Sequence, residues 1–177
     1  DVYKGQAVTP GYPWHGASGR QTFVALPGIT LEQDHKEDCI DVLDTQVREM
    51  RDGMFSGSAS AAEAADAPLW FFWTLQRLEK QLGAAEIWKR YGKVMKELLE
   101  AYRKGIAGCV ALRENGLIYA AADNKALTWL TSQIPGRAVT PPPGDPGQAT
   151  ACWSKAVCYT LQMARTQQHT PPPSARS

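Results

Sequence analysis

The chain has almost no net charge and no long run of apolar residues. Its 177 residues include 19 basic and 18 acidic ones, giving a formal net charge of +1. Nothing in this balance would attract nucleic acid or an anionic membrane surface. The longest apolar run, Ala67 to Trp73, contains Pro68 and is much shorter than the roughly 20 residues of a membrane-spanning helix. We therefore expect no nucleic-acid partner and no membrane partner.

Cysteine and histidine are too few and too scattered for a metal site. The four cysteines form no C-x-x-C pair, and the three histidines, His15, His35 and His169, are far apart. Because no spacing matches a set of metal ligands, we expect neither a metal nor a cofactor. The cysteines are expected to be free thiols on small buried side chains, since disulfide frameworks are typical of smaller secreted domains.

The start of the chain lacks an initiator Met and any signal-peptide pattern. We expect from this a fragment or a processed chain that is soluble and cytoplasmic. The first 19 residues, rich in Gly, Pro and aromatic residues, indicate an extended loop.

Helical periodicity is the main positive signal. Apolar residues recur every three or four positions, which predicts helices over about 39–53, 67–82, 85–103 and 148–166, with a shorter one at 21–26 that Pro27 and Gly28 interrupt. Asp66 is placed to cap the 67–82 helix, and Gly83 separates it from the next one as in a helical hairpin.

The remaining segments predict little regular structure. Asn115-Gly116 indicates a turn, residues 117–119 a brief strand, 126–132 a helical turn, and the proline-rich 135–146 a loop. With roughly six helices and no convincing sheet, we predict an all-α fold of stacked helical hairpins. One domain is expected over residues 1–169, followed by a disordered tail over 170–177.

Five strings stand out, in order along the chain. They are Gly11-Tyr-Pro-Trp14 with Gly19-Arg20 and Thr22-Phe-Val-Ala-Leu-Pro-Gly28; Asp66-Ala-Pro-Leu-Trp-Phe-Phe72; Asn115-Gly-Leu-Ile-Tyr-Ala120; Thr128-Trp129; and Thr140-Pro141 with Gly144 and Trp153. They resemble, in the same order, the family strings G-Y-P-W-F-G-x-W-G-R-D-T-F-I-A-L-P-G, V-D-A-P-L-W-F-F, D-G-L-I-Y-A-G, T-W-M-D-A and T-P-R-x-G-x-x-V-E-I-N-A-L-W-Y-N-A-L. These strings are those of the C-terminal amylo-α-1,6-glucosidase domain of glycogen debranching enzymes.

This resemblance implies an (α/α)6 toroid, of which the chain would form about half. It also implies hydrolysis, with inversion, of the single α-1,6-linked glucose at a branch point of glycogen-like α-glucans. Inverting hydrolysis needs one carboxyl group to protonate the leaving oxygen and a second to activate water.

The acidic positions of the family strings are neutral in this chain. They are occupied by Gln21, Thr131 and Gln148. None of these side chains titrates near neutral pH, so we assign no catalytic residue. Sugar-binding positions have also changed, to Ser18, Pro142 and Ser154-Lys155.

Four residues remain as candidates for substrate binding: Asp66, Trp129, Trp14 and Arg20. For Asp66 a helix N-cap is preferred over sugar binding. For Arg20 a solvated or structural role is preferred over pairing with a carboxylate. Trp70 could flank a sugar, but core packing is preferred.

We therefore predict a catalytically inactive scaffold derived from a debranching-type toroid. The apolar faces of the helices are retained, whereas the residues at the family's site positions are replaced. This contrast favours an engineered chain over a degenerate natural one. Self-association as a homodimer that completes the ring and weak α-glucan binding are the predicted interactions. The open alternative is an active glycoside hydrolase that uses other carboxylates, such as Glu63 or Asp123.

Overall fold

The computed structural model describes residues 18–55, 66–106, 110–120, 133–134, 137–138, 144 and 146–169. Helices form most of this part of the chain. They are α1 (Gly19–Ile29), the 3-10 turn η1 (Leu31–Gln33), α2 (Lys36–Glu49), α3 (Ala67–Leu82), α4 (Ala84–Lys104) and α5 (Gly147–His169).

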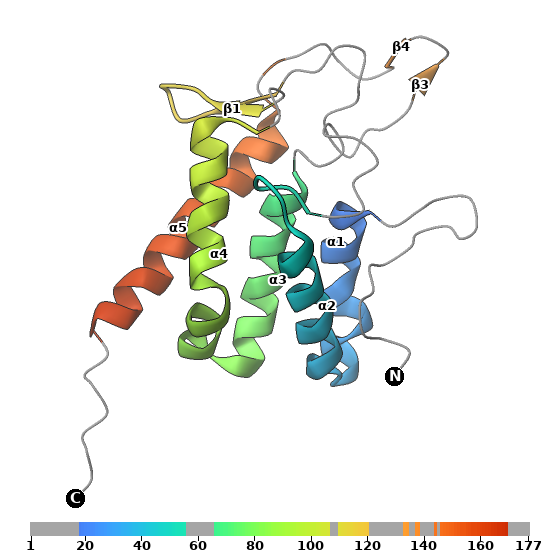
Figure 1. Cartoon of the computed structure of the whole chain (residues 1–177), viewed down its shortest axis with the longest axis vertical. Helices are drawn as coiled ribbons and strands as arrows, with labels where there is room; N and C mark the ends of the chain where they lie inside the picture. The colour runs from blue at the N-terminus through green and yellow to red at the C-terminus, as the bar shows by residue number, and fades with distance from the viewer. Residues whose placement is uncertain are drawn as a thin grey trace, which may run out of the picture.

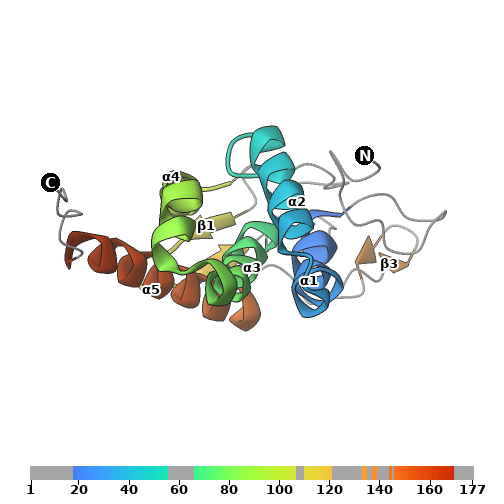
Figure 2. The same cartoon turned by 90° about the horizontal axis from the view of Figure 1, so that it is seen from below.

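The helices form two layers. One layer contains α1, α3 and α5, which run in the same direction, and the other contains α2 and α4, which run the opposite way (Figures 1 and 2). Helix α3 is central, because it packs against α1, α2, α4 and α5. This arrangement confirms the predicted all-α fold of helical hairpins.

Helix α1 continues through Pro27, where the sequence predicted an interruption. A proline at this position leaves the carbonyl of Phe23 without its helical N–H donor. The hydroxyl of Thr74, on α3, donates to that carbonyl at 2.7 Å. A neighbouring helix therefore replaces the hydrogen bond that the proline removes.

Helix α2 ends at Glu49, several residues before the predicted end near Gly53. The chain reverses in a tight turn in which the backbones of Arg51 and Met54 bond to each other. Asp52 and Gly53 both have positive φ, 51° and 76°. A Cβ atom at position 53 would lie 2.5 Å from the Cβ of Ala101, so the turn packs closely on α4. The prediction was wrong because this contact is not visible in the local pattern.

The hairpin of α3 and α4 agrees with the sequence to within one residue at each end. Gly83 separates the two helices with φ 80°, and its N–H donates to the carbonyl of Glu79 at 2.7 Å. Helix α5 extends three residues beyond the predicted end at Thr166.

Two small sheets were not predicted. Strand β1 (Val110–Leu112) pairs antiparallel with β2 (Ile118–Ala120), and β3 (Gln133–Ile134) pairs antiparallel with β4 (Arg137–Ala138). The brief strand expected at 117–119 lies within one residue of β2. The turn expected at Asn115-Gly116 is present, with Gly116 at φ 81°.

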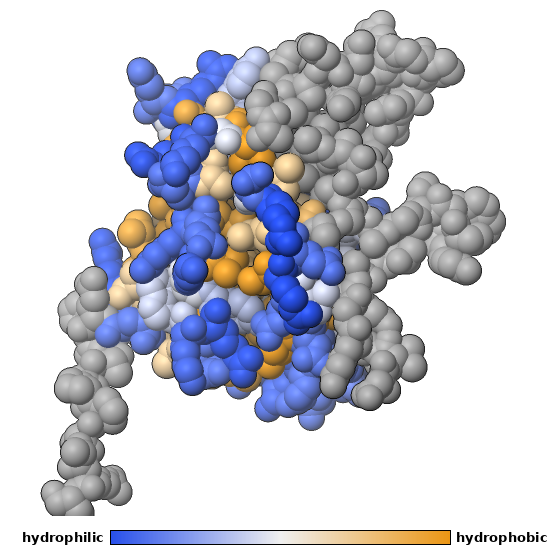
Figure 3. Space-filling view, in the orientation of Figure 1, coloured by the Kyte–Doolittle hydropathy of each residue, from blue (hydrophilic) through white to orange (hydrophobic). Residues whose placement is uncertain are grey.

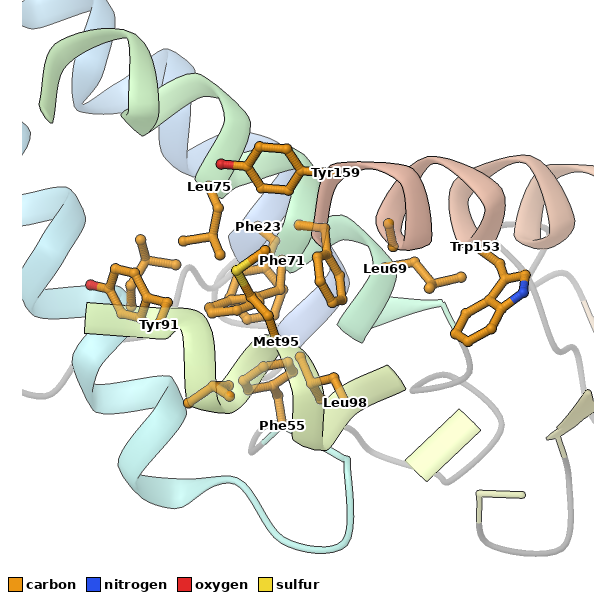
Figure 4. Close-up of a cluster of buried hydrophobic side chains, with 14 of the residues drawn as sticks. Phe23, Phe55, Leu69, Phe71, Leu75, Tyr91, Met95, Leu98, Trp153 and Tyr159 are labelled. Atoms are coloured by element: carbon orange, nitrogen blue, oxygen red, sulfur yellow. The ribbon is translucent and has the colours of Figure 1, made fainter. Parts of the chain in front are cut away.

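The core lies around α3, between the two layers (Figure 4). Phe23, Phe55 and Phe71 form a cluster in which ring centroids are 4.7 to 5.5 Å apart. At the α5 side, Tyr102 and Trp153 stack at 5.5 Å. Hydrophilic side chains cover much of the described part of the face formed by α2 and α4, with hydrophobic atoms visible between them (Figure 3).

Three cysteines lie among the described residues, and all three are free thiols, as predicted. Cys39 is buried, and burial raises the pKa of its thiol to about 11. Cys158 is exposed on α5, which corrects the expectation of burial for this residue. Cys109 lies outside the described residues. No helix in the described ranges is long and apolar enough to cross a membrane.

Candidate functional site

One end of the molecule brings together three of the helix N-termini. The first residues of α1, α3 and α5 lie at this end, where α4 also leads into β1 (Figure 1). Arg20 and Gln21 are in the first turn of α1, Asp66 immediately precedes α3, and Gln148 is in the first turn of α5. These four positions therefore lie at one end of the helical layer.

Arg20 and Asp66 form a buried ion pair at this end. The Nε of Arg20 donates to Oδ1 of Asp66 at 2.6 Å, and the side chains are only 11% and 3% exposed. The indole Nε1 of Trp70 lies 3.4 Å from Oδ2 of the same carboxylate. Both oxygens of Asp66 therefore have a donor within the protein, which leaves the carboxylate little capacity to bind a ligand.

Burial raises the pKa of Asp66, and this effect is larger than the opposing effect of the Arg20 charge and hydrogen bonds. The charge of Asp66 also reaches two other helices. Burial is the main cause of the raised pKa values of Tyr102 on α4 and Cys152 on α5, and the negative charge of Asp66 raises both further. The charge of Asp66 thus acts on Arg20 of α1, Tyr102 of α4 and Cys152 of α5.

The preferred interpretations of Asp66 and Arg20 were both wrong in part. Asp66 occupies the N-cap position of α3, but its side chain makes no capping hydrogen bond. Its backbone carbonyl accepts the N–H groups of Leu69 and Trp70 instead. The side chain faces Arg20, which is therefore paired with a carboxylate rather than solvated. The charge-assisted hydrogen bond between a buried guanidinium and a carboxylate is stronger than a single capping hydrogen bond.

Two of the three residues that align with acidic positions of the family strings, Gln21 and Gln148, lie among the described residues, and both are amides. Gln21 is exposed on α1, whereas Gln148 is half-buried on α5. The Oε1 atom of Gln148 is buried and has no hydrogen-bond partner among the described residues. Neither side chain can donate or accept a proton near neutral pH. Neither of these two described side chains can therefore act as a general acid or a general base.

Several predicted residues lie outside the described ranges. They are Trp14, Glu63, Asp123, Trp129, Thr131 and Pro142. Of the four candidate binding residues, the described part of the chain contains Arg20 and Asp66, and the structure brings these two together. Within the described residues no group of three or more His, Cys, Asp or Glu side chains could hold a metal ion.

An aromatic pair on α3 was not recognised from the sequence. Trp70 and Trp73 meet edge to face at 5.8 Å, and the guanidinium of Arg77 lies 5.3 Å from the ring centroid of Trp73. The spacing of these residues, three and then four positions apart, is the signal that could have placed them on one helix face. Trp70 packs against the core, as preferred from the sequence.

The family model described as amylo-alpha-1,6-glucosidase matches residues 2–173 of the chain. No curated protein matches the chain, and neither does any solved structure.

Proposed function

The chain belongs to the amylo-alpha-1,6-glucosidase family, and we propose that it is a catalytically inactive member that serves as a helical scaffold. The observation that carries the proposal is the chemistry at the family's acidic positions. Gln21 and Gln148 stand at two of them, and Thr131 at the third. Hydrolysis of a glycosidic bond needs a proton donor and a base, and these three side chains supply neither.

The surroundings of Asp66 support the same proposal. Asp66 is held by Arg20 and Trp70 and is almost completely buried. A general acid must reach the oxygen of the leaving group within hydrogen-bonding distance. A carboxylate that is already paired on both oxygens is better suited to joining α1 to α3. The proposal applies whether the neutral residues were introduced by redesign or arose by natural decay.

The intact core supports a scaffold role. Fully buried side chains from α1, α2, α3 and α4 still form one hydrophobic cluster, which side chains of α5 complete. The fold can therefore persist after the catalytic groups are lost, because core packing and site chemistry depend on different residues.

One observation favours the alternative of an active hydrolase. Burial raises the pKa of Asp66, and a raised pKa is what a general acid requires. In that case a second carboxylate, such as Glu63 or Asp123, would have to activate water. Both candidates lie outside the described residues.

The test is release of glucose from a limit dextrin that carries single α-1,6-linked glucose residues. We expect the wild-type chain to release no more than a blank without protein. The matched variant combines Gln21→Asp, Thr131→Asp and Gln148→Glu, which restores the family's acidic positions. A wild-type activity that Asp66→Asn abolishes would establish the hydrolase and overturn the scaffold proposal.

Weak α-glucan binding is a part of the family function that does not require the acidic side chains. We include it in the proposal through Trp14 and Trp129, since aromatic faces bind without titrating. Calorimetric titration with a maltooligosaccharide tests it, with Trp14→Ala and Trp129→Ala as variants. The absence of any heat of binding would remove this part of the proposal and leave the scaffold role standing.

A further inference from the structure

Two turns of the described chain contain an Asp or Asn followed by Gly. They are Asp52-Gly53, which follows α2, and Asn115-Gly116, which joins β1 to β2. Both glycines have positive φ, 76° and 81°, which glycine adopts without steric cost. Backbone hydrogen bonds close both turns. The two turns are therefore alike in sequence and in local backbone geometry.

Packing distinguishes the two turns. A Cβ atom built on Gly53 would lie 2.5 Å from the Cβ of Ala101, so this buried glycine is pressed against α4. A Cβ atom built on Gly116 would meet no atom of the described residues within 4 Å. Residues 113–116 are all exposed, in a hairpin that lies beyond the end of α4 (Figure 1). The peptide group between Asn115 and Gly116 can therefore reorient without displacing another element.

The side chain of Asn115 is held by its own turn. The backbone N–H of Leu117 donates to Oδ1 of Asn115 at 3.1 Å. This hydrogen bond polarises the side-chain amide and makes its Cγ atom more open to attack by a nucleophile. The N–H of Gly116 donates to the carbonyl of Arg113 at 2.9 Å. That bond must break before the nitrogen can react, and at an exposed turn water replaces it at low cost.

We propose that Asn115 is a site of spontaneous deamidation. The nitrogen of Gly116 loses its proton to hydroxide and attacks Cγ of Asn115, and the side-chain amide group takes a proton from water and leaves as ammonia. Water then adds to one carbonyl of the resulting five-membered imide and returns a proton to the Gly116 nitrogen. Opening at Cγ gives Asp, whereas opening at the backbone carbonyl gives isoaspartate. The reaction needs no substrate, so it is independent of the proposed function.

The two products differ in how well the hairpin accepts them. Either one lowers the formal net charge, +1 in the unmodified chain, by one unit. Asp keeps an oxygen that accepts the N–H of Leu117, and the family string D-G-L-I-Y-A-G has Asp at this position. Isoaspartate adds a methylene group to the backbone between Leu112 and Ile118, which pair directly. It should disturb that pairing and the hydrogen bond from the Ile118 N–H to Oγ1 of Thr150 on α5, at 3.2 Å.

The experiment incubates the full-length Asp52→Asn variant at mildly alkaline pH and follows both turns by peptide mass spectrometry. This variant has an Asn-Gly sequence in each turn, and Asn tolerates the φ of 51° at position 52. We expect conversion at position 115 to be about tenfold or more faster than at position 52, because reaction at Gly53 requires its turn to separate from α4. In urea, where the packing is lost, the two positions should convert at similar rates. Chromatography of the peptides should detect both Asp and isoaspartate.

The wild-type chain is followed in parallel, so the test at Asn115 does not depend on the folding of a variant. Asn115→Gln is the control and should stop conversion at this position, because glutamine would have to form a six-membered imide. An Asn115 that stays intact in the folded wild-type chain but converts in urea would overturn the proposal. Equal rates at positions 52 and 115 in the folded variant would overturn it too, because packing would then not select the site. Conversion without any isoaspartate would exclude the imide.

Discussion

Arg20 and Asp66 lie 46 positions apart in the sequence and form a buried ion pair, with 2.6 Å between Nε and Oδ1. The pair joins the first turn of α1 to the residue that precedes α3. The charge of Asp66 also contributes, after burial, to the raised pKa values of Tyr102 and Cys152.

Arg20→Gln should lower the free energy of unfolding by about 3 kcal/mol, because it leaves the carboxylate of Asp66 buried without its cation. Urea denaturation measures the change. Arg103→Gln is the control, since Arg103 pairs with Glu100 on the exposed face of α4 and its loss should have little effect. Equal effects of the two substitutions would show that the buried pair is not a stabilising contact.

Asp66 should titrate above 3.8, the ordinary value for this carboxyl group. The folded chain then keeps the proton at pH values where the unfolded chain has lost it. Its stability relative to Asp66→Asn therefore falls as pH rises from about the ordinary value to the pKa of the folded state, and is constant above that. Carboxyl NMR measures the titration directly.

Arg20→Gln extends this test, because removing the guanidinium should raise the pKa of Asp66 further. A carboxyl resonance that titrates at or below its ordinary value in the wild-type chain would contradict the account. It would mean that Arg20 outweighs the burial of Asp66.

Thr74→Val should lower the free energy of unfolding by roughly 1 to 3 kcal/mol, because the Phe23 carbonyl loses its donor inside the core. Val keeps the shape of the side chain. Thr160→Val is the control, since the Thr160 hydroxyl donates at 2.9 Å to a carbonyl within its own helix. If Thr160→Val lowers the free energy of unfolding as much as Thr74→Val does, the hydrogen bond from Thr74 to the Phe23 carbonyl contributes no more than one within a single helix.

Gly53→Ala should destabilise the chain by about 1 to 3 kcal/mol, since φ is 76° and the new Cβ would collide with Ala101. The control, Gly28→Ala, adds a methyl group within helix α1 where no atom lies within 4 Å. It should be neutral or stabilising by up to about 1 kcal/mol. Thermal unfolding of both variants compares the two glycines, and a harmless Gly53→Ala would show that the turn tolerates a side chain.

The sequence predicts those parts of the fold that local pattern determines. The apolar spacing along α3 and α4, with Gly83 between them, places both helices to within one residue. The end of α2 could not be placed, because it depends on the contact between Gly53 and Ala101. The passage of α1 through Pro27 depends in the same way on Thr74, which is distant in the sequence.

The site could be predicted only as a set of positions. The family strings identify Arg20, Asp66 and Gln148 as residues of interest, and the structure places all three at one end of the helical layer. That Arg20 and Asp66 pair with each other depends on how α1 packs on α3, and no pattern within either helix contains that information.

The most direct test of the account is whether the wild-type chain releases glucose from an α-1,6-branched limit dextrin at high protein concentration and long incubation. The account predicts no release above the blank, because Gln21, Thr131 and Gln148 occupy the acidic positions of the family. Release above the blank that disappears in Asp66→Asn would contradict it, and would identify the buried carboxyl group as part of a working active site.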